Sequence, residues 1–288
     1  MTRLKMAAGL VALAMVALSC GKADVNSPGT GGAREPNSLI LRMSTEGGFI
    51  PQEYTLQRIP EFTLTGDGRV FTLGAQIAIY PGPAMPPLLV RPIESDGIDA
   101  IIAEAKAAGL DGPDKEYRYD LVADAGTTVF TFVDDDGKTH TIRAYALGFE
   151  AEGGNAPPGQ TADEREARTK LAKLRDKLSD VSSWLPNGSF GEDKPAEVER
   201  LRVYASGYTQ SDDGLTQPPK AWPLDTPVAS WGAAYGDRYR CGVIEGAELD
   251  RALPAFKESN ARTPWTSEGR QYELILRPLL PDETGCPQ

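Results

Sequence analysis

The chain has 288 residues, of which 40% are hydrophobic and 25% are charged, and these fractions are typical of a globular protein with a hydrophobic core. Its 41 acidic and 30 basic residues give a net charge of −11. This charge excludes nucleic acid as a partner, because proteins bind phosphates through Lys and Arg. The length fits one or two domains.

Residues 1–19 are typical of a secretory signal peptide. The basic residues Arg3 and Lys5 precede an apolar stretch, residues 6–18, that is too short to cross a bilayer. The following "ALSC" resembles the end of a bacterial lipoprotein signal, in which the cysteine is acylated and becomes the new N-terminus. We therefore expect Cys20 to carry the lipid, palmitate included, and the protein to sit on the extracytoplasmic face of a bacterial membrane. Simple secretion and an uncleaved anchor are the alternatives.

Residues 20–37 contain no apolar periodicity and predict a flexible tether with a reach of about 20–25 Å. Cleavage would also remove Arg3 and Lys5, so that 28 basic residues face 41 acidic ones and the net charge becomes −13. Such a chain is repelled by anionic lipid headgroups. Membrane attachment is therefore expected through the lipid alone.

The other two cysteines, Cys241 and Cys286, are expected to form a disulfide, because an oxidising compartment favours their pairing. Two unpaired thiols or a metal site are the alternatives. Two cysteines alone make a poor zinc site.

The first half of the chain alternates extended runs with turns. Residues 38–49 predict a strand, and residues 61–72 predict a hairpin that turns at Asp67-Gly68. A helix is expected to begin at Ser95, to present an apolar stripe that includes Ile98 and Ile101, and to end at Gly109.

A second hairpin is predicted over residues 127–145, with a two-residue turn at Asp136-Gly137. That turn would place Val133 opposite His140 and Thr131 opposite Ile142.

The clearest helix is predicted over residues 162–185, where Thr161 and Glu164 form a capping box before an apolar stripe. The stripe predicts core packing, with a coiled-coil partner as the alternative. The last third predicts a strand at 198–208, a strand and a helix over 239–260 that Pro254 kinks or splits, and a final strand at 270–281.

These elements predict an α+β fold of antiparallel hairpins with two to three packed helices. The fold would occupy residues 38–288 as one domain or as two subdomains, 38–185 and 186–288, of which the second contains the disulfide.

No catalytic residue, metal site or cofactor is predicted. His140 is the only histidine, and we interpret it as a neutral side chain at the edge of the core, with a general base as the alternative. "GKT" at 137–139 lacks the first glycine of a phosphate-binding loop, and no G-x-G-x-x-G occurs. The acidic runs at 134–136 and 211–213 lack the spacing of a calcium loop.

Aromatic residues gather in the segment 204–239 and in the "TPW" turn that follows it. Exposed Tyr and Trp side chains are typical of recognition surfaces. We therefore predict a ligand or partner surface, with the alternative that the rings pin an irregular segment to the domain. Its members are Tyr208, Trp222, Trp231, Tyr235 and Trp265.

The signal together with "EFTLTGDGRV", "DRYRCGV" and "TPW…RPLLP" resembles a group of bacterial extracytoplasmic lipoproteins over nearly the whole mature chain. That resemblance implies a location and no activity. Residues 39–185, with Gly47-Gly48-Phe49 after the first strand, resemble the layout of emfourin-type inhibitors of thermolysin-like metalloproteases. That second resemblance implies protease inhibition, and no inhibitory residue is assigned.

The hypothesis that follows is a lipid-anchored cell-envelope protein that binds an envelope protein or a glycan. One alternative is an envelope hydrolase that uses carboxylates on a cell-wall or sugar substrate, and another is a protease inhibitor with a rigid loop at 80–92.

Overall fold

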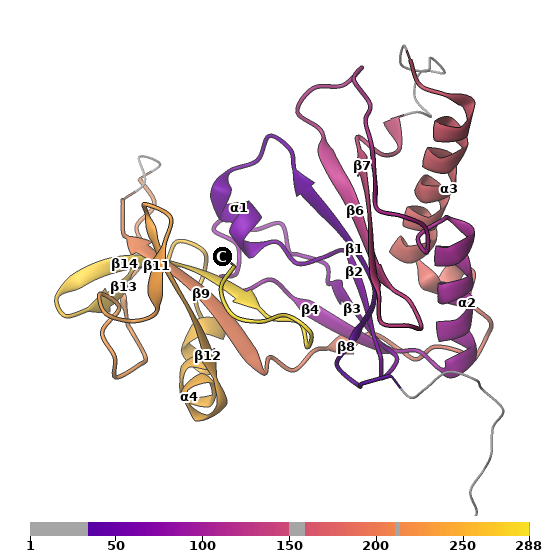
Figure 1. Cartoon of the computed structure of the whole chain (residues 1–288). Coiled ribbons are helices and arrows are strands. Elements are labelled where there is room, and N and C mark those ends of the chain that lie inside the picture. The colour runs from indigo at the N-terminus through magenta and orange to yellow at the C-terminus, as the bar shows by residue number, and fades with distance from the viewer. Residues whose placement is uncertain (1–33, 150–158, 211–213, 288) are drawn as a thin grey trace, which may run out of the picture. The chain divides into compact units, whose positions relative to one another are not determined.

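The structure of the protein, a computed structural model, describes residues 34–149, 159–210 and 214–287. The described residues form two mainly antiparallel β-sheets and four α-helices, α1 to α4, which confirms the predicted α+β fold (Figure 1). The chain passes from one sheet to the other after residue 195. The predicted signal peptide, Cys20 and most of the predicted tether lie outside the described residues.

The larger sheet has eight strands in the order β5-β7-β6-β1-β2-β3-β4-β8. Its neighbours are antiparallel apart from the parallel pair β5 and β7. The strands are β1 (Leu39–Gly47), β2 (Phe62–Thr65), β3 (Arg69–Leu73), β4 (Leu88–Pro92), β5 (Lys115–Tyr117), β6 (Gly126–Val133), β7 (Thr139–Tyr145) and β8 (Lys194–Pro195).

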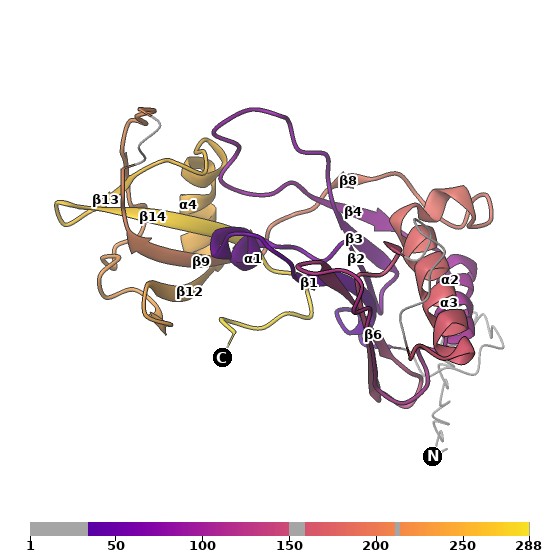
Figure 2. The same cartoon turned by 90° about the horizontal axis from the view of Figure 1, so that it is seen from above.

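Helices α2 (Ser95–Ala107) and α3 (Ala162–Ser179) cover one face of the eight-stranded sheet (Figure 2). The predicted capping box of Thr161 and Glu164 is present at the start of α3. The apolar stripe of α3, which includes Leu171 and Leu174, packs into the core of the protein. Arg168 of α3 is fully buried, and it donates hydrogen bonds to carbonyl oxygens that include that of Tyr145, at 2.8 Å.

The register predicted for the second hairpin is wrong by one residue. Phe132 of β6 pairs with His140 of β7, because the turn has three residues rather than two. The amide of Asp134 donates to the carbonyl of Lys138 at 3.0 Å, and Gly137 has a φ of 77°. A three-residue hairpin loop needs one residue in this left-handed conformation, and glycine adopts it without strain.

The smaller sheet has six strands in the order β10-β13-β14-β9-β12-β11. Helix α4 (Gly246–Lys257) packs on one face and continues through Pro254, so that of the two predicted effects of this proline, a kink or a split, the split does not occur. On the opposite face, Leu56 of α1 (Gln52–Gln57) packs against Tyr204 and Ile275. The strands are β9 (Arg200–Gly207), β10 (Lys220–Ala221), β11 (Ala233–Tyr235), β12 (Tyr239–Glu245), β13 (Trp265–Ser267) and β14 (Arg270–Pro278).

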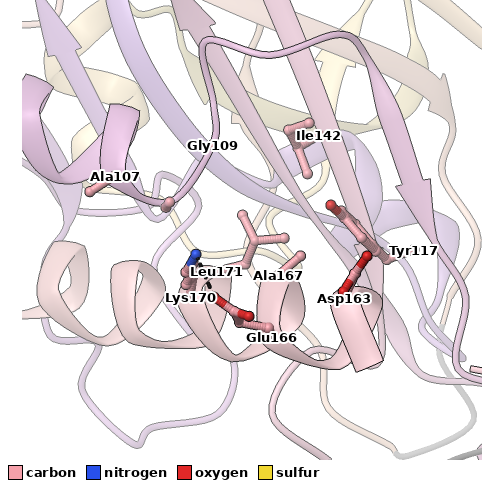
Figure 3. A pocket seen from close by; sticks show the side chains of 10 residues that line it. Ala107, Gly109, Tyr117, Ile142, Asp163, Glu166, Ala167, Lys170 and Leu171 are labelled. Atoms are coloured by element: carbon pink, nitrogen blue, oxygen red, sulfur yellow. Dashed lines mark ion pairs between the residues drawn. The ribbon is translucent and has the colours of Figure 1, made fainter. Parts of the chain in front are cut away.

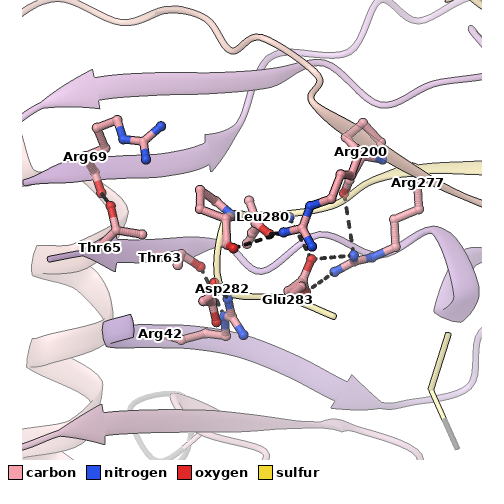
Figure 4. A network of polar contacts seen from close by, with 11 residues as sticks. Arg42, Thr63, Thr65, Arg69, Arg200, Arg277, Leu280, Asp282 and Glu283 are labelled. Atoms are coloured by element: carbon pink, nitrogen blue, oxygen red, sulfur yellow. Dashed lines mark hydrogen bonds and ion pairs between the residues drawn. The ribbon is translucent and has the colours of Figure 1, made fainter. Parts of the chain in front are cut away.

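The C-terminal segment, residues 279–287, is fixed by covalent and ionic contacts. Cys286 forms the predicted disulfide with Cys241 of β12, with their Cα atoms 6.1 Å apart. Asp282 pairs with Arg42 of β1 at 2.7 Å, and Glu283 pairs with Arg277 of β14 at 2.6 Å (Figure 4). The segment therefore contacts strands of both sheets.

Candidate functional site

The three tryptophans of the predicted contact surface lie in the core. Trp222, Trp231 and Trp265 are 7%, 8% and 1% exposed. They pack around Phe256 of α4, whose ring centroid is 5.2 Å from that of Trp265. The prediction of an exposed surface is wrong for these residues, because burying their large rings stabilises the irregular segment that carries Trp222 and Trp231. The alternative, in which the rings pin that segment to the domain, describes them correctly.

The two tyrosines of the predicted surface lie on the other face of the six-stranded sheet, away from α4. Tyr235 of β11 pairs with Tyr239 and is half-buried, with its ring centroid 5.2 Å from that of Tyr204. Tyr208 follows β9 and is half-buried, and its backbone amide donates a hydrogen bond to the carbonyl oxygen of Gln271 at 3.1 Å. Side chains alternate along a strand, so Tyr208 shares the face of Tyr204.

His140 is satisfied within the fold. Its Nδ1 lies 2.6 Å from the carbonyl oxygen of Gly112, and its Nε2 lies 2.9 Å from Oδ2 of Asp134. The hydrogen bond that Nε2 donates to Asp134 raises the pKa of the His140 ring, and the side chain is only 4% exposed. Because both ring nitrogens have partners inside the protein, this geometry gives the histidine a structural role rather than that of a general base.

Two hollows lie beside α3. The first, of about 280 Å³, lies where α2 and α3 approach β5 and β7, with Ile142 and Leu171 in its lining (Figure 3). Glu166 and Lys170 face it as an ion pair of 2.8 Å, and Lys170 lowers the pKa of Glu166.

The second hollow, of about 390 Å³, lies between the end of α3 and strands β2 to β4. Arg91 and Asp193 lie in its lining and form a two-pronged ion pair. Asp193 raises the pKa of Arg91, so the two charges compensate each other. Each of the two hollows thus contains an acid paired with a base.

Two carboxyls with diverging pKa values occur instead on the face of the six-stranded sheet that α1 partly covers. Glu53 of α1 and Glu273 of β14 both pair with Arg238, at 2.8 and 3.7 Å, and the hydroxyl of Tyr239 donates to Glu53 at 3.3 Å. The pKa of Glu53 is lowered, chiefly by a hydrogen bond from its own backbone amide and also by Arg238 and Tyr239. Burial raises the pKa of Glu273. We call these four residues, with Ser206, the Glu273 cluster.

Ser206 lies directly beside Glu273 in this cluster. The two residues form a cross-strand pair between β9 and β14, and Ser206 is 4% exposed. Its Oγ has no hydrogen-bond partner among the described residues. An unpartnered buried hydroxyl is uncommon in native proteins, because it loses its hydrogen bonds to water without replacement.

A second unusual feature is a set of exposed apolar side chains at one end of the eight-stranded sheet. Phe49, which follows β1, is 90% exposed, and Ile77 and Ile79, which follow β3, are 62% and 57% exposed. Strands β1 and β3 run in the same direction, because each is antiparallel to β2, so both loops leave the sheet at the same end. We call this surface the apolar end; it comprises Phe49, Ile50, Ile77, Ile79 and Tyr80.

Both loops of the apolar end are held by backbone hydrogen bonds. The amide of Phe49 donates to Asp124 at 3.3 Å, and the amide of Ala84 donates to Ser259 at 3.1 Å. Phe49 and the end of the second loop are therefore held in place, which lowers the conformational entropy that a partner must overcome there.

Residues 34–149, 159–210 and 214–287 contain no helix long and apolar enough to span a membrane, and no group of three or more potential metal-ligating side chains. Comparisons of the chain with protein-family models, with curated proteins and with solved structures find no match.

Neither the Glu273 cluster nor the apolar end was predicted from the sequence. The alternation in "RVYASGY" (202–208) places Ser206 between two tyrosines on one strand face, and this was the available signal for the cluster. Glu53, Arg238 and Glu273 are far apart in sequence, and no local pattern connects them.

Proposed function

We propose that this protein is a lipid-anchored binding protein on the outer face of a bacterial membrane, and that its apolar end docks a protein partner. The observation that carries the proposal is the exposure of Phe49, Ile77 and Ile79 at one end of a single sheet. Burial of such side chains against a partner contributes about 25 cal/mol for each Å² of apolar surface removed from water. For this proposal these side chains must form one contiguous patch, because such patches, and not single exposed apolar side chains, mark interaction sites.

The positions of Arg34 and Phe49 at opposite ends of the sheet favour a protein rather than the bilayer as the binding partner of the apolar end. Arg34 bonds to Val133 and Asp135 at the far end of β6, opposite the end where Gly47 pairs with Gly126. The nine residues of β1 span about 30 Å between the two ends. A tether from Cys20 therefore enters at one end of the sheet, and Phe49 lies at the other.

The net charge of the chain also favours a protein partner over the bilayer. The mature chain carries a net charge of −13, counted from the 28 basic and 41 acidic residues that remain after the signal peptide. An anionic bilayer surface repels such a chain, whereas a protein partner can present basic groups around an apolar patch.

Catalysis is the weaker candidate. Glu53 and Glu273 have pKa values that diverge as an acid and a base would require, but neither lines the two hollows described above. A glycoside hydrolase must hold the scissile bond between its two carboxyls, which is a stricter requirement than binding a sugar through surface contacts.

In-cell photocrosslinking tests the proposal. A photoreactive residue would replace Phe49 or Ile77 in the full chain, with Lys173 on the exposed face of α3 as the matched control. We expect one recurrent protein adduct from Phe49 and Ile77 and none from Lys173. Adducts with lipid alone, or the same adducts from all three positions, would overturn the proposal.

A further inference from the structure

We propose that the Glu273 cluster is a binding site for a neutral polyhydroxylated ligand, such as an oligosaccharide, and that Ser206 and Glu273 contact its hydroxyl groups. This site is separate from the apolar end. It lies on the face of the six-stranded sheet opposite α4, where Tyr208 and Tyr235 are half-buried.

The buried hydroxyl of Ser206 has no hydrogen-bond partner among the described residues. Ser206 pairs with Glu273 on one side, and since Arg240 pairs with Ala205, the antiparallel register places Tyr239 on the other side. The carboxylate of Glu273 accepts no hydrogen bond from any described residue, and its closest cation, Arg238, stands 3.7 Å away. Two adjacent polar side chains are thus left with unused hydrogen-bonding capacity.

The chemistry of the ligand follows from what these two groups lack. A carboxylate only accepts hydrogen bonds, whereas a serine hydroxyl both donates and accepts. A ligand hydroxyl can donate to Glu273 and accept from Ser206 at once. An anionic ligand would place a second negative charge beside the carboxylate of Glu273, and it would offer this carboxylate no hydrogen-bond donor.

The charge of the surroundings favours a neutral ligand. Glu53 and Glu273 supply two negative charges, and Arg238 and Arg262 act on Glu273 with two positive ones. A balanced site gives little net attraction to a cation or an anion. Specificity in such a site depends on hydrogen bonds and on contact with apolar surface.

The tyrosines supply that apolar surface. Tyr235 lies in the same cross-strand row as Ser206, Tyr208 lies two residues further along the chain from Ser206, and both tyrosines are half-buried. A partly exposed tyrosine offers a flat apolar face and a polar edge with few rotatable bonds. The C–H faces of a sugar ring can pack on such rings while its hydroxyls reach Ser206 and Glu273.

Arg238 covers the cluster in the free protein. Its side chain is 49% exposed and bridges Glu53 and Glu273. An exposed ion pair of this kind contributes little to stability, so a ligand can displace Arg238 from Glu273 at small cost.

Calorimetric titration of the full chain with maltotriose, cellotriose and tri-N-acetylchitotriose tests this assignment, together with thermal unfolding of the same variants. We expect at least one trisaccharide to bind. Ser206→Ala and Glu273→Gln should each weaken binding by at least tenfold, whereas Asp250→Asn on the exposed side of α4 should leave it unchanged. Ser206→Ala should also raise the Tm of the free protein by about 2–4 °C, because it removes an unpartnered buried hydroxyl.

Four results would overturn the assignment. The first is an absence of binding by all three trisaccharides, and the second is binding that Ser206→Ala leaves unchanged. The third is a lower Tm for Ser206→Ala, which would show that a bound water satisfies the hydroxyl and that Ser206 is structural. Binding of trilysine in place of the sugars would identify a cationic ligand and would also contradict the proposal.

Discussion

Ser206 and Glu273 stand opposite each other on β9 and β14, and neither side chain forms a hydrogen bond within the part of the chain that the structure describes. Natural proteins tolerate such unsatisfied polar groups most readily where they contribute to function rather than to stability. This relationship makes the face of the six-stranded sheet a candidate site in its own right.

Replacing Glu273 by Gln should increase stability at neutral pH. Burial raises the pKa of Glu273, so the folded protein binds this proton more tightly than the unfolded chain does. Stability therefore falls as the pH rises above the unfolded value of about 4.3 towards the raised folded value. Glu273→Gln should raise the Tm by about 1–4 °C at pH 7 and by less at pH 4. Thermal unfolding at the two pH values measures this, and a lower Tm at pH 7 would contradict it.

Breaking the pair of Glu283 and Arg277 should destabilise the protein strongly. The side chains are 13% and 7% exposed, and they share contacts of 2.6 and 2.7 Å. Burial opposes the ionisation of Glu283, but Arg277 outweighs that effect and lowers its pKa. Glu283→Gln should reduce the free energy of unfolding by about 3–5 kcal/mol, because it leaves a buried guanidinium unpaired.

Urea unfolding at pH 7 and pH 3 measures this loss. Because the folded pKa of Glu283 is lowered, its contribution is present above the unfolded value and disappears as the pH falls through the folded value. The exposed Glu192→Gln serves as the control. A loss at pH 7 no larger than that of the control would show that the pair does not stabilise the C-terminal segment.

Removing the disulfide should cost about 2–5 kcal/mol of unfolding free energy. Cys241 and Cys286 are 45 residues apart in sequence, so the bond restricts a long loop of the unfolded chain. Cys286→Ser should show this loss in denaturant unfolding, and dithiothreitol should lower the stability of the native sequence towards that of the variant. Equal stability of the oxidised and reduced proteins would refute the prediction.

Cys20 should carry the lipid. Cells that express the full chain should incorporate labelled palmitate into the protein, and Cys20→Ser should lose the label and release the protein from the membrane fraction. The hydrophobic contribution of about 0.8 kcal/mol for each buried methylene makes attachment by several acyl chains durable. Equal labelling of Cys20→Ser would rule out this attachment point.

Much of the fold was predictable from local signals. The capping box at Thr161, the turn at Asp67-Gly68 and the pairing of Cys241 with Cys286 follow from residue chemistry at known spacing, and the structure has all three. The register of the second hairpin was not predictable in this way, because Asp136-Gly137 fits both a two-residue and a three-residue turn. The residues of the turn do not distinguish these, and the pairing of Phe132 with His140 depends on core packing.

The functional surfaces were less predictable, because aromatic content does not reveal burial. Tyr208 ends a predicted strand and Trp265 lies in a predicted turn, yet it is Trp265 that packs under α4, whereas Tyr208 lies on the other face of the sheet. The Glu273 cluster brings together residues from α1, β9, β12 and β14. Only the tertiary structure makes Glu53 and Glu273 neighbours.

The measurement that tests the docking proposal most directly combines the two loops of the apolar end. A photoreactive residue at Phe49 would be crosslinked in cells in the otherwise native chain, in Ile77→Ser/Ile79→Ser, and in a Lys173→Ser control. If both loops form one docking surface, the double variant should reduce the yield of the Phe49 adduct by at least tenfold while the control leaves it unchanged. An undiminished adduct in the double variant would show that the two loops do not bind a common partner.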